Sequence, residues 1–235
     1  MADYKKGQGY PGGNISDLVK HSNLEQLARL ANPRAYIEFH SGEGKYKDYE
    51  GSALRVLRIM DSQLKDYKAF LHEIDEDRKN NLETNTSEFE KHLSIRGDWK
   101  EHVKKYIKQA DPTFLFLLDP TYMEEYSEHK GLLRYLPKLL NTGANIFMFA
   151  PQKLKEPEHK QTISKIRSTI KKSGRAAVDL MHPTVKGGHY ARTDHNIIVT
   201  DKKILDKIIN THNKTFSRFL KYKRFKEFKD SFHFI

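Results

Sequence analysis

The chain has 235 residues, of which 37% are hydrophobic and 31% are charged, a size and composition typical of one large globular domain. It contains no cysteine, which excludes a disulfide framework, a thiolate metal site and a cysteine nucleophile. Its formal net charge of +11 favours a polyanionic partner, nucleic acid first. The N-terminus lacks the apolar segment of a signal peptide, and no apolar stretch is long enough to span a bilayer. We therefore expect a soluble, cytoplasmic protein with no membrane partner.

Short apolar strands alternate with amphipathic helical stretches along most of the chain. An opening helix is predicted near Asp17–Leu30. The patterns then predict seven strands, at Ala35–Phe39, Ala69–Ile74, Leu93–Arg96, Thr113–Leu118, Ala144–Phe149, Ala176–Met181 and Asn196–Thr200. Helices are predicted between most of them, at Ser52–Gln63, Asp75–Leu82, Trp99–Gln109, Gly131–Leu140 and Pro157–Ser173. This alternation is typical of βαβ units and a mainly parallel sheet.

The last two predicted strands are joined by a Gly-rich loop, Lys186-Gly187-Gly188-His189, which is too short to carry a crossover helix. This pair should therefore be antiparallel. We predict an α/β fold with a Rossmann-like seven-stranded sheet, mainly parallel with an antiparallel last strand pair. We expect an N-terminal segment and helix over 1–34, the Rossmann-like domain over 35–205, and a basic, aromatic C-terminal helix packed on it over 206–235.

The first predicted strand ends in the run Tyr36-Ile37-Glu38-Phe39-His40-Ser41-Gly42-Glu43-Gly44. Glycines at 42 and 44 let the backbone approach a ligand closely, although a lone G-x-G is equally typical of an ordinary tight turn. A dinucleotide fingerprint would place a third glycine at position 47, where the chain has Lys47. This difference disfavours a nicotinamide cofactor.

The second strand ends in His72-Glu73-Ile74-Asp75, and the third ends in Ile95-Arg96-Gly97-Asp98-Trp99. An acidic residue at the end of the second strand can accept hydrogen bonds from both ribose hydroxyls of an adenosyl group, and Glu73 fits this role best. Asp75 is suited to capping the next helix. Asp98 is placed to bond an adenine amine while Trp99 covers the ring. The alternative is an N-cap aspartate followed by a core tryptophan.

The apolar run Phe114–Leu118 is followed by Asp119-Pro120-Thr121-Tyr122, at the end of a strand where open α/β sheets bind ligands. A carboxylate there can accept from an exocyclic amine of a flat base while the aromatic ring stacks on that base. The alternative is a proline-containing turn. The tetrapeptide resembles the Asp/Asn-Pro-Pro-aromatic motif of methyltransferases that modify such amines, with Thr121 in place of the second proline.

The segment Gly13–His21, before the first strand, resembles the G-N-x-x-D-x-x-K-H opening of bacterial large-subunit ribosomal RNA (adenine-N6) methyltransferases. That family continues with a G-x-G loop, a G-S-P segment and Asp-Pro-Pro-Tyr. Gly51-Ser52-Ala53 and Asp119–Tyr122 match the last two imperfectly. The resemblance covers roughly residues 10–152, and the three-Cys-motif partner methyltransferases are a more distant relative.

This resemblance implies a class I methyltransferase with S-adenosyl-L-methionine as its cofactor, and adenine N6 in RNA, or in DNA, as its target. It implies a catalytic role for Asp119, Pro120 and Tyr122, with Lys20 binding the cofactor's carboxylate or shaping the base pocket. The cofactor-binding residues would be Glu38, His40, Gly42, Gly44, Ser52, Glu73, Ile74, Gly97, Asp98, Trp99 and Asp119. The run Asp3–Pro11 departs from the family, so a small-molecule or protein methyltransferase stays open as an alternative. The loss of the second motif proline at Thr121 leaves a noncatalytic nucleic-acid-binding homologue open as well.

The end of the chain, Lys214–Ile235, combines cations with phenylalanines at three- and four-residue spacings, which indicate an amphipathic helix packed on the body. Its cations Lys221, Arg224 and Lys226 are predicted to contact phosphates; the alternative is a solvated face. The histidines at 182, 189 and 195 lack a helix-spaced ligand pair, so we expect no metal site.

Overall fold

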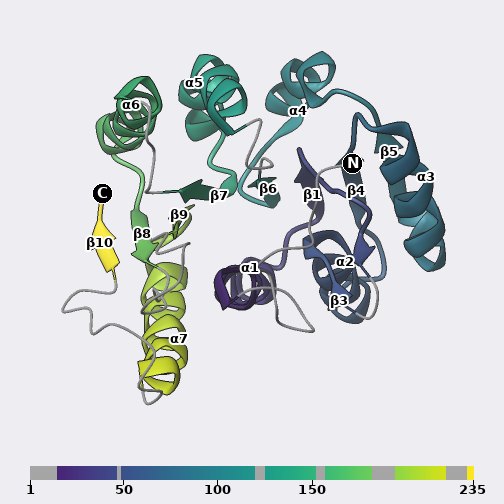
Figure 1. Cartoon of the computed structure of the whole chain (residues 1–235), viewed down its shortest axis with the longest axis horizontal. Helices are drawn as coiled ribbons and strands as arrows, with labels where there is room; N and C mark the ends of the chain where they lie inside the picture. Colours follow the sequence, from purple (N-terminus) through teal and green to yellow (C-terminus); the bar gives the residue numbers. More distant parts are fainter. Residues whose placement is uncertain (1–14, 47–48, 120–124, 152–156, 182–193, 221–231) are drawn as a thin grey trace.

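The computed structural model describes residues 15–46, 49–119, 125–151, 157–181, 194–220 and 232–235 (Figure 1). Its centre is an eight-stranded sheet in the order β10-β8-β9-β7-β6-β1-β4-β5. The strands of this sheet are β1 (Ala35–Glu38), β4 (Lys68–His72), β5 (Leu93–Arg96), β6 (Phe114–Leu118), β7 (Asn145–Pro151), β8 (Ala177–Met181), β9 (Asp194–Val199) and β10 (Phe232–Phe234). A separate hairpin pairs β2 (Lys45–Tyr46) with β3 (Tyr49–Glu50).

The sheet is parallel from β5 through β4, β1 and β6 to β7, and β9 runs antiparallel between β7 and β8. Apart from the additional edge strand β10, this confirms the predicted α/β fold, a Rossmann-like seven-stranded sheet that is mainly parallel with an antiparallel last pair. The central strand β6 is apolar throughout because both of its faces are covered. In β6, Leu115 and Leu117 join the core on one face, while Phe116 and Leu118 join the core on the other.

Helices form a layer on each side of the sheet (Figure 1). One layer contains α1 (Ile15–Ala31), α2 (Ser52–Gln63) and α7 (Lys202–Leu220), and the other contains α4 (Val103–Gln109), α5 (Glu125–Asn141) and α6 (Pro157–Ser173). The helix α3 (Glu76–Asn85) follows β4, and the short turns η1 (Ser87–His92) and η2 (Trp99–Glu101) flank β5. No helix in the described ranges combines the length and the apolar character that a membrane span requires.

The C-terminal segment differs from its prediction. The expected helix over Lys214–Ile235 is α7, which begins earlier and ends at Leu220, whereas Phe232–Phe234 is a strand paired antiparallel with β8. Phenylalanine suits strands as well as helices, and the edge of β8 offers unpaired backbone groups that a further strand satisfies. The sequence reasoning also missed the β2–β3 hairpin, whose two-residue strands are too short to show a period.

Candidate active site

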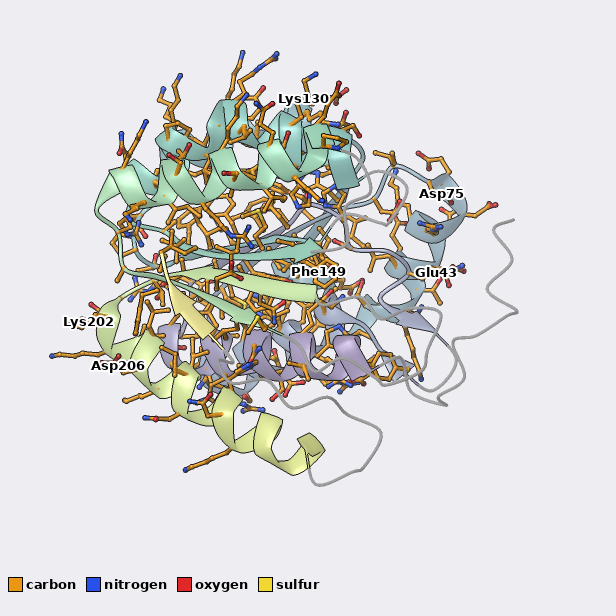
Figure 2. All side chains as sticks on the ribbon, turned by 60° about the vertical axis from the view of Figure 1, so that its left-hand side comes forward. Glu43, Asp75, Lys130, Phe149, Lys202 and Asp206 are labelled. Atoms are coloured by element: carbon orange, nitrogen blue, oxygen red, sulfur yellow. The ribbon has the colours of Figure 1, made fainter. Side chains whose placement is uncertain are left out.

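The carboxyl ends of the four neighbouring strands β1, β4, β5 and β6 lie together at one edge of the sheet. Backbone hydrogen bonds continue the pairing past the strand ends: Phe39 N donates to Leu117 O (3.0 Å), Ser41 N to His72 O (2.9 Å) and Glu73 N to Arg96 O (3.0 Å). Figure 2 shows Glu43, Asp75 and Phe149, from three separate segments, on this same side of the molecule. The predicted convergence of strand ends is therefore present.

Glu38, the last residue of β1, lies fully buried beneath this edge. Its carboxylate accepts hydrogen bonds from the Tyr36 hydroxyl (2.8 Å) and from the Ser52 hydroxyl at the start of α2. Burial raises the pKa of Glu38 to about 7, although both hydrogen bonds act in the opposite direction. The structure thus brings the predicted residues Glu38 and Ser52 together, where they tie the first strand to the helix behind the loop.

The two glycines of the loop after β1 have different surroundings. Both adopt positive φ, +58° at Gly42 and +72° at Gly44, a conformation that other residues rarely tolerate. A Cβ at Gly44 would lie 2.9 Å from Leu82 Cδ1, so this glycine is required by packing. A Cβ at Gly42 would meet no atom within 4 Å, so this glycine borders open space on the ligand side of the loop.

The end of β4 presents an acidic and an apolar side chain. Glu73 is buried; its Oε1 accepts from the Asp75 amide (3.0 Å), and its Oε2 has no hydrogen-bond partner among the described residues. Ile74 is 62% exposed, one of two large apolar side chains that stand out in the described parts of the chain. Asp75 caps α3 by accepting from the Arg78 amide (2.9 Å), as the capping alternative predicted.

The end of β5 contacts the side chain of His72 in β4. His72 Nδ1 lies 3.0 Å from Gly97 O and therefore carries the proton, because a carbonyl oxygen only accepts. A Cβ at Gly97 would meet nothing within 4 Å, so the chain leaves space in front of this residue. Asp98 uses one oxygen to cap η2, accepting from the Lys100 amide (2.9 Å).

The prediction that Trp99 covers the adenine ring is wrong. Its side chain is 2% exposed and stacks on Phe39 with ring centroids 4.4 Å apart and an interplanar angle of 2°. It also meets Tyr135 of α5 edge to face. The rings therefore fill the core beneath the site, because burying two large aromatic surfaces against α5 stabilises the fold more than exposing them at a ligand edge. The core alternative holds.

A cluster around Glu128 of α5 was not anticipated from the sequence. Its carboxylate accepts hydrogen bonds from Trp99 Nε1 (2.6 Å), Lys100 Nζ (2.5 Å) and His40 Nε2 (3.1 Å). Burial opposes ionisation of Glu128, but these hydrogen bonds together lower its pKa to about 2. The predicted residue His40 is oriented by this carboxylate, and its Nδ1 is buried without a hydrogen-bond partner among the described residues.

At the end of β6, Asp119 is joined to α1 by an ion pair. The distance from Lys20 Nζ to Asp119 Oδ2 is 2.5 Å, and the two side chains are only 11% and 15% exposed. Lys20 Nζ also lies 5.4 Å from the centre of the Phe149 ring, at the end of β7. The structure thus brings two predicted catalytic residues together and adds an aromatic ring. Phe149 could have been found from the sequence by applying to the next strand the rule that singled out Asp119.

A second unanticipated residue lies beside Phe149. Asn196 of β9 is directly opposite Phe149 in the β7–β9 pairing, so both side chains point to the same face of the sheet. Its side chain is fully buried, and neither its amide nitrogen nor its oxygen has a hydrogen-bond partner within the described parts of the chain. An unpaired buried amide is costly and rare, which marks this position as unusual.

Several predicted residues lie outside the described residues: Pro120, Thr121, Tyr122, His182, His189, Lys221, Arg224 and Lys226. Their roles stay predictions. Among the residues whose side chains are placed, no group of three or more His, Asp or Glu is arranged to hold a metal ion.

The fold resembles several solved structures. A Legionella pneumophila protein, LPL1258 of family DUF519, has a TM-score of 0.68 at 16% identity, and the match covers 96% of this chain and 97% of that one. An O-methyltransferase from Bacillus cereus, in complex with S-adenosylhomocysteine, has a TM-score of 0.54 at 14% identity over 77% and 80% of the two chains. A proposed O-methyltransferase from Klebsiella pneumoniae has a TM-score of 0.53 at 14% identity, and the match covers 82% of this chain and 92% of that one.

No protein-family model and no curated protein sequence matches the chain. The structural likenesses, all at low identity, show the fold. They confirm the predicted Rossmann-like architecture, and the sheet order agrees. The finer resemblance to the ribosomal RNA (adenine-N6) methyltransferases stays a prediction, because the two methyltransferase neighbours described above are named for O-methylation.

Proposed function

We propose that the protein is an S-adenosylmethionine-dependent methyltransferase that modifies an exocyclic amine of a nucleic-acid base, with adenine N6 in RNA favoured over DNA. The observation that carries this proposal is the meeting of Lys20, Asp119 and Phe149 at the edge of the sheet from which the loop with Gly42 also leaves. A carboxylate held in place by a cation, next to an aromatic ring, suits a flat base that bears an amine. The net charge of +11 supports a polyanionic substrate.

The ends of β1, β4 and β5 fit an adenosyl group. Space in front of Gly42 and Gly97 admits the ligand, and Oε2 of Glu73 is available to accept from a ribose hydroxyl. Ile74 offers an apolar surface for adenine, and Asp98 retains one carboxylate oxygen for its amine. S-adenosylhomocysteine bound to the Bacillus cereus relative supports the same ligand class. When bound, the cofactor supplies an electrophilic methyl group on a sulfonium.

The chain's own groups would act on the acceptor. An exocyclic amine is a poor nucleophile because its lone pair is delocalised into the ring. Asp119, held by Lys20, accepts a hydrogen bond from the amine N–H, which returns electron density to the nitrogen and fixes its direction. The surplus proton leaves to water after transfer. Positioning therefore supplies most of the acceleration, and an unpaired or flipped base is required.

Other residues complete the acceptor side in this proposal. Phe149 supplies an apolar wall, and the amide of Asn196 beside it, which has no hydrogen-bond partner among the described residues, is available to a polar group of the base. By resemblance, the Pro120 carbonyl would accept the second amine hydrogen and Tyr122 would stack on the base. Glu38 and Glu128 support the site without contacting the substrate. Glu38 bonds Ser52 behind the loop after β1, and Glu128 orients His40 within that loop.

Methyl transfer to a hydroxyl of a small molecule is the second candidate. It is favoured by the two neighbours named as O-methyltransferases. That reaction needs a base to remove the hydroxyl proton, whereas Asp119 is already engaged by Lys20. It also assigns no use to the large positive charge. A noncatalytic nucleic-acid-binding homologue remains the third candidate, and it would bind nucleic acid without retaining the cofactor.

The test is incubation of the protein with methyl-labelled cofactor and, separately, with RNA and DNA lacking base methylation, followed by mass spectrometry of the nucleosides. Labelled N6-methyladenosine in RNA is the expected product. Calorimetry of cofactor binding runs beside it. Absence of cofactor binding would end the enzyme proposal, and label found only in a hydroxyl acceptor would replace the amine by the second candidate.

A further inference from the structure

The outer surface of the helix layer formed by α4, α5 and α6 is strongly basic. The helices of this layer contain eleven Lys and Arg residues but only three Asp and Glu residues. In α1, α2 and α3 the two kinds are balanced at six each, whereas α7 contains five Lys and Arg residues and one Asp residue. The layer formed by α1, α2 and α7 therefore has nine Lys and Arg residues and four Asp and Glu residues, a smaller excess of cations than the layer formed by α4, α5 and α6.

We define the basic surface by the exposed cations of this layer that form no ion pair with any described carboxylate. Their side chains are exposed, so they lie along the solvent side of each helix. The members are Lys104, Lys105 and Lys108 of α4, Arg134 and Lys138 of α5, and Lys160, Lys165, Lys171 and Lys172 of α6. Figure 2 shows side chains with nitrogen tips projecting outward from these helices.

The pairing of cations differs on the other layer. Both arginines of α2 are neutralised: Arg55 by Glu25 at 2.6 Å, and Arg58 by Glu50 at 3.0 Å and Glu88 at 3.1 Å. A cation that already has a carboxylate partner gains less from a phosphate than one without. The basic surface is therefore better suited to a polyanion than the surface of α2.

The basic surface begins at the candidate active site. The helices α4, α5 and α6 follow the parallel strands β5, β6 and β7 in the chain. The N-terminal end of each helix therefore lies near the carboxyl ends of these strands. Lys130, in the first turns of α5, lies on the same side of the molecule as Phe149 and Asp75 in Figure 2. A long ligand lying along these helices can therefore reach the strand ends.

We propose that the basic surface binds the phosphate backbone of the RNA whose base enters the site at Asp119. This rests on the proposed function and adds to it where the body of the substrate lies. A membrane fits the surface less well, because interfacial helices insert large apolar side chains. The two large apolar side chains that are exposed among the described residues, Ile74 and Phe234, both lie outside this helix layer.

The test compares two triple variants that remove the same charge from exposed positions. The first is Lys104→Gln, Arg134→Gln and Lys165→Gln, one on each helix of the basic surface. The control is Lys202→Gln, Lys203→Gln and Lys207→Gln on α7, the other basic helix, whose first turn lies at the opposite edge of the sheet from Phe149 (Figure 2). The probe is a fluorescein-labelled 20-nucleotide RNA hairpin with an unpaired loop, measured by anisotropy from 50 to 300 mM salt.

We expect the surface variant to lose at least about tenfold in affinity near physiological salt and to flatten the salt slope by about 2, since three phosphate contacts are removed. The control should stay within about twofold of wild type. Equal losses in both variants would overturn the inference, because net charge alone would then explain binding. So would an unchanged surface variant, or preferential binding of wild type to vesicles containing anionic phospholipid.

Failure of the inference is distinguishable from failure of the proposed function. Both variants should retain cofactor affinity by calorimetry, because none of their positions lies at the strand ends. If wild-type protein binds the hairpin through the basic surface but transfers no methyl group to any RNA, the inference holds while the proposed function fails. If it transfers methyl groups to RNA and the surface variant binds normally, the inference fails alone.

Discussion

Lys20 Nζ lies 2.5 Å from Asp119 Oδ2, an ion pair that joins α1 to the end of β6 across 99 positions of sequence. Both side chains are largely removed from solvent, so removing either one leaves the charge of the other poorly solvated and without a partner. The pair therefore links the stability of the opening helix to the geometry of the site. It also explains how a lysine before the first strand and an aspartate after the fourth belong to one site.

A double-mutant cycle tests this link. Lys20→Met should lower the free energy of unfolding by about 1–3 kcal/mol, because Asp119 keeps its charge without a partner. Adding Asp119→Asn should recover part of that loss. Urea denaturation at neutral pH measures all four proteins. Additive losses in the double variant would show that the two side chains do not interact.

Glu73 and Asp75 form a matched pair of acidic residues with different expected roles. Glu73→Ala should weaken cofactor binding by about 1–3 kcal/mol through lost ribose hydrogen bonds, with little change in stability. Asp75→Ala should cost about 1 kcal/mol of stability through loss of the α3 cap and leave cofactor affinity unchanged. Calorimetry and thermal melts separate the two. Equal cofactor affinities in both variants would remove Glu73 from the cofactor site.

Trp99 is expected to act through the core. Trp99→Phe keeps most of the stacking on Phe39 but removes the Nε1 donor to Glu128, so it should lower stability by about 1–2 kcal/mol. Cofactor affinity should remain within about twofold of wild type. A larger loss of affinity without a loss of stability would restore the adenine-covering role that the structure excludes.

The raised pKa of Glu38 predicts that the stability of the protein falls as the pH rises. Its pKa is raised in the folded protein, so the folded state holds a proton that the unfolded state releases at lower pH. The wild-type free energy of unfolding should therefore fall as pH rises from about 4.5 to about 7 through this group. Glu38→Gln lacks this dependence and should gain about 3 kcal/mol relative to wild type across that window. Denaturation curves at several pH values measure it; a constant difference would contradict the raised pKa.

The regular elements were largely predictable from the sequence. Segments Ser52–Gln63 and Pro157–Ser173 form α2 and α6 with the predicted bounds, and Leu93–Arg96 is β5 as predicted. These segments carry strong hydrophobic periods or apolar runs between clear breaks. The strand β10 was not predictable in the same way, because three residues at a sheet edge depend on the partner strand that pairs with them.

The candidate site was predictable where it follows from topology and not where it follows from packing. Asp119, Glu73 and Asp98 lie at strand ends, which the order of elements places at one edge. The role of Glu128 depends on contacts with residues 28, 29 and 88 positions away, and no local pattern indicates them. Trp99 was misplaced because an aspartate followed by a tryptophan suits both a ligand edge and a capped helix over a core.

The most direct measurement of the central claim is methyl transfer to RNA by Asp119→Ala, with cofactor affinity and the thermal melt recorded on the same preparation. We predict that transfer falls below detection while cofactor affinity changes by less than about threefold, since the proposed function assigns Asp119 to the amine of the base. Any loss of stability should be matched by Lys20→Met, which provides the control for breaking the ion pair. Full transfer to RNA by a folded Asp119→Ala protein would contradict the assignment of this carboxylate to the amine acceptor.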